Sequence, residues 1–232
     1  MWSQTRRQRR LDITLTLVIV LGIVCFLVVW GFIFCRTAPY DPNPLPVKRS
    51  QLRCGDILLT IPKKGHVTAE HVVRQLAMRS MVLHVAVVLD AETIYESTGK
   101  GGAGAQIISM DAFLERRQES NHVLVRQATP RLSAEACTAL RNAAQERVGT
   151  PYDYSIWSLT VDPLLPPHAI ATEGGLYCTS AVWEVLQAAG VLGKAPERRK
   201  LLILDDFASW RERLVFPRTS DVRFTIERVL QV

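Results

Sequence analysis

The sequence predicts an α+β domain, in which a mostly antiparallel sheet packs on helices, preceded by one transmembrane helix. Three observations support this fold class: short β-branched runs that end at turn residues, segments with apolar residues at helical spacing, and one long uncharged stretch near the N-terminus. The strands and helices alternate irregularly along the 232 residues, which favours an α+β arrangement over separate layers of one type.

The uncharged stretch covers residues 13–34 and contains no charge across 22 positions. It is long enough to span a bilayer and too long for the apolar region of a signal peptide. Four arginines precede it: Arg6, Arg7, Arg9 and Arg10. Because only Arg36 follows closely, we expect a cytoplasmic tail over 1–12 and a single-pass membrane protein whose remaining chain lies in the periplasm, a lumen or the cell exterior.

Residues 35–51 are rich in proline and predict an extended linker, so that the folded domain covers residues 52–232. The formal net charge is +6, and half of it comes from the N-terminal residues that include the four arginines of the tail. No concentrated basic face is left in the folded part, so a nucleic-acid partner is not expected. The oligomeric state is left open.

The elements of the domain follow from local patterns. Strands are expected where apolar or alternating runs end at turn residues, over 56–62, 82–89, 93–98, 106–110, 122–127 and 222–232. Helices are expected over 68–79, over a segment that contains 112–117 and is capped by Asp111, over 134–149 capped by Ser133, and from Cys178 onward. The glycine-rich segment 99–105 lacks the spacing of a phosphate-binding loop and indicates a turn, and residues 151–175 are irregular.

The five cysteines are odd in number and widely spaced, so they do not define a disulfide framework. A bridge between Cys54 and Cys137 suits an exported domain, but the sequence leaves it open. No CxxC or HExxH pattern is present, so neither a metal site nor a cofactor is expected.

Cys178 opens a helix directly after Tyr177. The unpaired N–H groups and the dipole of a helix N-terminus favour a thiolate, which is the nucleophilic form of cysteine. The alternative is that Cys178 is a small buried apolar residue, which is common for an unbridged cysteine. Because Cys178 begins the apolar stripe of its helix, it is expected to face the sheet, where a thiolate needs a proton acceptor.

His84 is the candidate acceptor, because it lies in the middle of an apolar strand. If residues 90–92 form a three-residue hairpin loop, Ala86 lies opposite Glu96, and Glu96 becomes a diagonal neighbour of His84 on the same face. Its carboxylate would then hold one imidazole nitrogen while the other faces the sulfur, as in a cysteine hydrolase. The alternatives are a core histidine bonded to a backbone carbonyl and a solvated glutamate at a strand end.

Four motifs, "CGDILLT", "LHVAVVLDAETIYEST", "GTPYDY" and "LYCTSAVWEVLQAAG", resemble those of the NlpC-type papain-like cysteine hydrolases. Their order is reversed relative to ordinary members, and this resembles the circularly permuted branch of YaeF/YiiX-type amidases, related to lecithin:retinol acyltransferase-like enzymes. The resemblance implies a permuted papain-like fold, Cys178 as nucleophile, His84 as general base and Glu96 as its orienting residue. It also implies that the Tyr152 hydroxyl helps to hold the oxyanion.

The function expected from these residues is that of a membrane-anchored cysteine hydrolase or acyl transferase. It would cleave an amide, ester or thioester bond of a peptide, lipid or other acyl substrate through an acyl-enzyme on Cys178. The alternative is a catalytically silent papain-like binding module at a membrane surface. The sequence does not distinguish a peptide from a lipid substrate.

Overall fold

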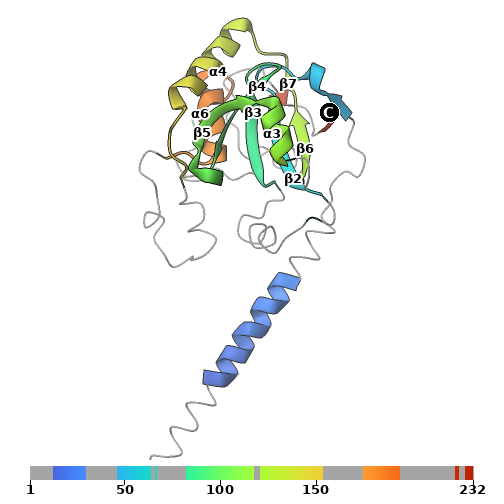
Figure 1. The fold of residues 1–232 in the computed structure, drawn as a ribbon, viewed down its shortest axis with the longest axis vertical. Helices are drawn as coiled ribbons and strands as arrows, with labels where there is room; N and C mark the ends of the chain where they lie inside the picture. The colour runs from blue at the N-terminus through green and yellow to red at the C-terminus, as the bar shows by residue number, and fades with distance from the viewer. Residues whose placement is uncertain are drawn as a thin grey trace, which may run out of the picture.

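A computed structural model describes residues 13–29, 46–63, 66, 82–117, 121–153, 175–193, 223–224 and 228–231. Its centre is a seven-stranded sheet in the order β1-β9-β6-β2-β3-β4-β5 (Figure 1). Strands β1 and β9 run parallel, and the other neighbouring strands of this sheet run antiparallel. The predicted α+β class with a mostly antiparallel sheet is therefore confirmed.

The strands agree closely with the sequence prediction. The large sheet contains β1 (Pro46–Lys48), β2 (Ile57–Pro62), β3 (His84–Val88), β4 (Thr93–Thr98), β5 (Gly104–Ser109), β6 (Asn121–Arg126) and β9 (Arg228–Gln231). A two-stranded sheet pairs β7 (Ala128–Thr129) with β8 (Arg223–Phe224). The closing strand predicted over 222–232 is thus represented by two shorter strands, and the helix predicted over 68–79 lies outside the described residues.

Helices cover both faces of the sheet (Figure 1). On one face, α4 (Ala134–Arg147) and α6 (Cys178–Ala188) bury apolar side chains against the strands, including Leu140, Val182 and Leu186. On the other face, α3 (Met110–Arg117) contributes Met110, Phe113 and Leu114 to a second apolar cluster. The alternating side chains of β3 divide between the two clusters, Val85 and Val87 in the first and Ala86 and Val88 in the second.

The helix starts show one confirmed cap and one correction. Ser133 caps α4 as predicted, since its Oγ accepts a hydrogen bond from the Ala136 N–H at 3.2 Å. Asp111, predicted as the cap of α3, lies inside the first turn of that helix instead. Ser109 takes the capping role there, because its Oγ accepts from the Ala112 N–H at 3.1 Å. A hydroxyl one residue before the helix is closer to the unpaired N–H groups than a side chain within the turn.

The end of the predicted linker is joined to the sheet. Strand β1 pairs with β9, Val47 is buried, and a short 3₁₀ helix, η1 (Arg49–Gln51), follows. Residues 46–51 therefore pack with the domain predicted to start at residue 52. The proline-rich composition does not exclude this, because Pro46 is the first residue of its strand, where a missing N–H is tolerated.

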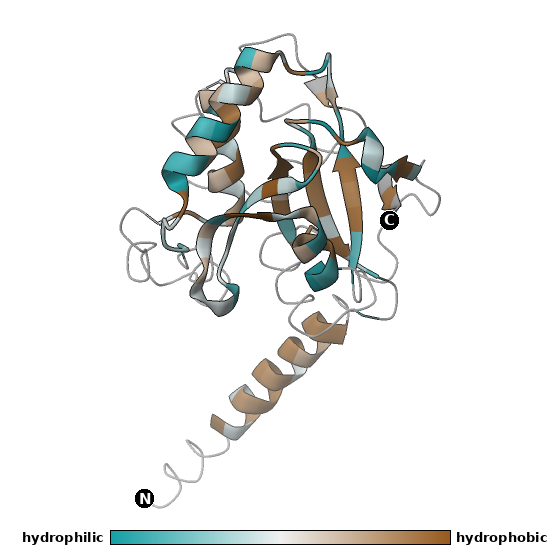
Figure 2. Cartoon of the chain, turned by 45° about the horizontal axis from the view of Figure 1, so that its top comes forward, coloured by the Kyte–Doolittle hydropathy of each residue, from teal (hydrophilic) through white to brown (hydrophobic). Residues whose placement is uncertain are grey.

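Residues 13–29 of the predicted 13–34 transmembrane helix form a helix that is mostly hydrophobic along its length (Figure 2). Its large apolar side chains are exposed. Residues 30–34 lie outside the described part of the chain. Within the described residues, the structure contains no helix that is both long enough and apolar enough to cross a membrane.

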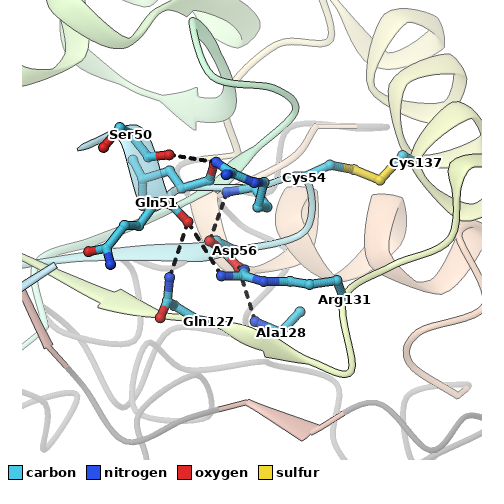
Figure 3. A network of polar contacts seen from close by, with 10 residues as sticks. Ser50, Gln51, Cys54, Asp56, Gln127, Ala128, Arg131 and Cys137 are labelled. Atoms are coloured by element: carbon cyan, nitrogen blue, oxygen red, sulfur yellow. Dashed lines mark hydrogen bonds and ion pairs between the residues drawn. A yellow bond between two sulfur atoms is a disulfide. The ribbon is translucent and has the colours of Figure 1, made fainter. Parts of the chain in front are cut away.

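A disulfide between Cys54 and Cys137 ties the start of β2 to α4 across 83 residues of sequence (Figure 3). The sequence had left this pairing open. Closing a loop of this length removes conformational freedom from the unfolded chain, an effect of about 4 kcal/mol in the chain-entropy account. The link joins α4 covalently to the segment before β2.

Next to the disulfide, Asp56 of the "GD" motif is fully buried and joins three segments (Figure 3). Its Oδ2 accepts from the Arg53 N–H at 2.9 Å, and its Oδ1 accepts from the Ala128 N–H at 3.0 Å and from Arg131 Nη1 at 2.6 Å. Burial raises the pKa of Asp56 above its ordinary value, although these hydrogen bonds and the charge of Arg131 oppose the rise. The motif is thus a structural anchor in this fold.

Candidate active site

His84 and Glu96, predicted to lie side by side, are in direct contact. Strands β3 and β4 pair Val87 with Tyr95 and Val88 with Ile94, which is the register predicted from a three-residue loop. The two buried side chains meet with His84 Nε2 at 2.7 Å from Glu96 Oε2. The hairpin therefore sets this contact, and the alternative of a solvated glutamate at a strand end is excluded.

Glu96 is surrounded by further donors from two other elements. Gln106 of β5 pairs directly across from Glu96 and donates from Nε2 to Oε1 at 2.9 Å. Arg117 Nη2, at the end of α3, lies 3.4 Å from Oε2, and Arg116 Nη1 lies 3.7 Å from Oε1. Burial by itself would raise the pKa of Glu96, but the hydrogen bond and charge of His84, the charge of Arg117 and the hydrogen bond from Gln106 lower it to about 2.

The ionised state of Glu96 determines how the imidazole is arranged. A carboxylate can only accept hydrogen bonds, so His84 Nε2 must carry the proton that it shares with Oε2. In a neutral imidazole the other nitrogen is then the basic one. Nδ1 is therefore the atom of His84 that can take a proton from a nucleophile.

Cys178 is the first residue of α6 and is buried. Tyr177 occupies the N-cap position in an extended conformation and makes no side-chain hydrogen bond to the first turn. The positive end of the helix dipole therefore acts on the Cys178 side chain without a competing cap. Cys178 is present as a thiol, in contrast to the bridged Cys54 and Cys137.

A buried hydrogen bond places the start of α6 at one end of the sheet. Ser97 Oγ donates to the Leu176 carbonyl at 2.5 Å, near the point where β4 ends. His84 is the first residue of the neighbouring antiparallel strand β3, so it lies at the same end. Cys178 follows Leu176 by two residues, which brings the start of α6 to this end as well.

The two candidate catalytic residues reach this end of the sheet from different layers. The His84 ring lies on the α3 side, with its centroid 6.4 Å from that of Phe113. Cys178 belongs to the apolar cluster on the α4 and α6 side. The sequence had placed the cysteine against a face of the sheet and the histidine on that same sheet, without separating the two faces.

Tyr152 is half-buried and packs against the first apolar cluster. Its two neighbours are hydrogen-bonded to the segment before α6, because the Leu176 N–H donates to the Pro151 carbonyl at 2.9 Å and the Asp153 N–H donates to the Leu176 carbonyl at 3.3 Å. The long gap in sequence between Tyr152 and Cys178 is therefore bridged by backbone pairing next to the helix start.

A close backbone approach fixes the segment that carries Tyr152. Gly104, at the start of β5, has a φ of +62°, and a Cβ at this position would lie 2.2 Å from the Thr150 carbonyl oxygen. The next residue, Ala105, donates its N–H to that same oxygen at 2.8 Å. Only glycine suits such a position, so the glycine-rich stretch predicted as a turn also serves this contact.

Sequence reasoning missed Gln106, Arg116 and Arg117. Gln106 could have been found by extending the strand pairing from β4 to β5, since it lies opposite Glu96. Arg116 and Arg117 lie at the end of a predicted helix, where basic residues are common because they interact favourably with the helix dipole. The local sequence therefore did not identify them as site residues. Among the described residues there is no group of three or more His, Cys, Asp or Glu side chains that could hold a metal ion.

Comparison with known proteins yields a likeness in structure only. No protein-family model matches the sequence, and no curated protein does so either. The chain is similar to the solved structure of yiiX from Escherichia coli O157:H7, described as a metalloprotein of DUF1105. The TM-score is 0.49 with 19% sequence identity, over 77% of this chain and 98% of yiiX. At this level the similarity supports no conclusion about the site.

Proposed function

We propose that this protein is a cysteine hydrolase or acyl transferase of the permuted papain-like type, with Cys178 as nucleophile and His84 as general base. The observation that carries the proposal is the contact between His84 Nε2 and the buried carboxylate of Glu96 at 2.7 Å. It leaves Nδ1 as the basic nitrogen at the end of the sheet where the Cys178 helix begins. A histidine that served only the core would not need an ionised partner, whose burial is costly.

The proposed reaction proceeds in two stages. The Cys178 thiol gives its proton to His84 Nδ1, and the sulfur attacks the carbonyl carbon of an amide, ester or thioester, so that a C–S bond forms and the carbonyl oxygen becomes an oxyanion. The oxyanion collapses, the bond to the leaving group breaks, and the imidazolium protonates that group. Water or an acceptor alcohol or amine then attacks the thioester, passing its proton to His84 and releasing the thiol.

Two further residues have supporting roles in this proposal. Glu96 holds the imidazole ring in one orientation and stabilises the imidazolium that forms during the reaction. Tyr152 is placed by its neighbours beside the residues that precede Cys178, and we assign its hydroxyl to the oxyanion. The substrate class is a peptide, lipid or other acyl compound, and the observations do not favour one of these.

The test of this function is the reactivity of Cys178 towards iodoacetamide, followed by peptide mass analysis of the full-length protein in detergent. A helix N-terminus and a basic imidazole both favour the thiolate. The alkylation rate should therefore rise with pH, and the midpoint of this rise should lie below the pKa of about 8.5 of an unperturbed thiol. Cys178 should therefore be modified much faster at pH 6 in the folded protein than in the unfolded chain. Cys54, bridged to Cys137, offers no thiol for comparison.

The reference measurement is Cys178 in the same protein unfolded in guanidinium, where neither the helix nor His84 is in place. A folded protein whose Cys178 reacts at the unfolded rate, or not at all, would contradict the hydrolase proposal. The silent binding module would then take its place.

We further propose that residues 13–34 anchor the protein in a membrane with the folded domain outside the cytoplasm. The uncharged stretch and the four preceding arginines support this orientation. The Cys54–Cys137 disulfide agrees with it, because such bonds persist in oxidising compartments. A reporter that is active only in the cytoplasm should stay inactive when fused after Val232, whereas an active fusion would disprove the proposed topology.

A further inference from the structure

Arg117 is an unusual residue for the end of a helix. As the last residue of α3 its side chain would ordinarily extend into solvent, yet only 19% of it is exposed. Its guanidinium lies over the ring of the buried Phe113, with Cζ 5.6 Å from the ring centroid. The stacking fixes the guanidinium on the same side of the sheet as the His84 ring.

The partners of this guanidinium are the groups of the candidate site. Arg117 Nη2 lies 3.4 Å from Glu96 Oε2, the same oxygen that is bonded to His84 Nε2. Burial lowers the pKa of Arg117, while the negative charges of Glu96 and of the Cys178 thiolate both raise it. Arg117 is therefore in direct contact with the carboxylate of Glu96, and its positive charge favours a negative charge on Cys178.

We propose that Arg117 is a positioning residue of the Cys178 site, which keeps Glu96 ionised beside His84 and stabilises the Cys178 thiolate. This inference rests on the proposed function. Burying most of a guanidinium costs desolvation free energy unless its charge and its N–H donors both find partners. Here one donor binds the carboxylate, and the charge also acts on the thiolate.

Within the described part of the chain, the charged groups that face Glu96 come from two elements, β3 and α3. His84 faces Glu96 from β3, and Arg116 and Arg117 face it from α3. Arg116 lies farther from the carboxylate, at 3.7 Å, and 43% of its side chain is exposed. Water screens an exposed charge more strongly, so Arg116 should contribute less to the thiolate than Arg117.

The experiment compares the pH dependence of Cys178 alkylation by iodoacetamide in the wild-type protein, Arg117→Gln, Arg117→Lys and the matched control Arg116→Gln. Arg117→Gln removes a positive charge from the site, so the midpoint of its alkylation profile should lie about one pH unit higher than that of the wild-type protein. Lysine keeps the charge but not the stacked planar group, so Arg117→Lys should recover part of the change. Arg116→Gln should show a clearly smaller shift.

The outcomes separate this inference from the proposed function. If the wild-type profile is that of an ordinary thiol, the proposed function itself fails. If the wild-type profile is displaced to low pH and depends on His84, but Arg117→Gln reproduces it, then only the role of Arg117 is disproved. A structural role alone would slow or unfold both Arg117 variants without a charge-dependent difference between glutamine and lysine at this position.

Discussion

His84→Gln should slow the release of p-nitrophenolate from p-nitrophenyl acetate by about 10²–10⁴-fold, the usual contribution of a positioned general base. Glutamine can still donate a hydrogen bond to the buried carboxylate of Glu96, which His84 contacts at 2.7 Å. It cannot take the proton from Cys178. The substitution thus removes the basic nitrogen while sparing the packing, and the loss should appear in the first turnover as well as in the steady state.

The matched control is His122→Gln. His122 also lies on a strand, β6, and burial together with the charge of Lys63 lowers its pKa. It sits opposite Ile61 rather than beside Glu96, so its replacement should leave the rate unchanged. Equal rates for wild-type protein and His84→Gln, in samples that remain folded by circular dichroism, would remove His84 from the mechanism.

Glu96 should behave differently from His84 in the same assay. Because its pKa is lowered to about 2, the carboxylate remains ionised throughout the pH range in which hydrolysis of p-nitrophenyl acetate can be measured. The acid limb of the rate should therefore report the cysteine and histidine rather than the glutamate. Glu96→Gln should lower the rate less than His84→Gln does, since Glu96 orients the base and does not itself remove a proton.

The contact between His84 and Glu96 was predictable because both residues belong to one hairpin. A short loop fixes the register of the strands on either side, and the register then decides which side chains are neighbours. The apolar runs likewise located most strands, since burial on both faces demands apolar residues at consecutive positions.

The features that escaped prediction join distant parts of the chain. Arg117 meets Glu96 across 21 residues, and the Cys54–Cys137 bridge closes a loop with a separation of 83 residues. Taken alone, Arg117 is an ordinary basic residue at a helix end, and each cysteine is an ordinary small apolar residue. Their partners are identified only once the helices are packed on the sheet. The sequence also did not show that Cys178 and His84 reach one end of the sheet from different layers, because strand periodicity assigns a face but not the helix that covers it.

Asp56→Ala should destabilise the fold by about 2–6 kcal/mol, because two backbone donors lose their buried acceptor. The carboxylate accepts hydrogen bonds from two backbone N–H groups, of Arg53 and Ala128, as well as from Arg131. Alanine would leave both backbone donors without this acceptor in a buried environment, at a cost of about 1–3 kcal/mol each. Urea unfolding followed by tryptophan fluorescence measures the change.

The control for this prediction is Asp111→Ala. Asp111 also forms an ion pair with an arginine, Arg49, but 76% of its side chain is exposed. Exposed pairs of this kind contribute about 0–1 kcal/mol, so the free energy of unfolding should hardly change. A loss in Asp56→Ala no larger than in Asp111→Ala would show that the "GD" aspartate is not the anchor described above.

Substitution of the partner residue, Arg131→Ala, tests in which direction the stability of the fold changes with pH. Burial already raises the pKa of Asp56, and Arg131 opposes that rise, so removing the guanidinium should raise this pKa further. A carboxyl whose pKa is higher in the folded state than in the unfolded state stabilises the fold most below the unfolded value. That contribution is lost as the pH rises through the folded value. The loss of stability in Arg131→Ala should therefore be larger at pH 7 than near pH 4, where Asp56 is more fully protonated.

The loss of stability in Arg131→Ala should also be smaller than that in Asp56→Ala, because both backbone donors keep their acceptor and 43% of the Arg131 side chain is exposed. A loss that is independent of pH would mean that Arg131 acts through packing alone and that the charge of Asp56 does not need it.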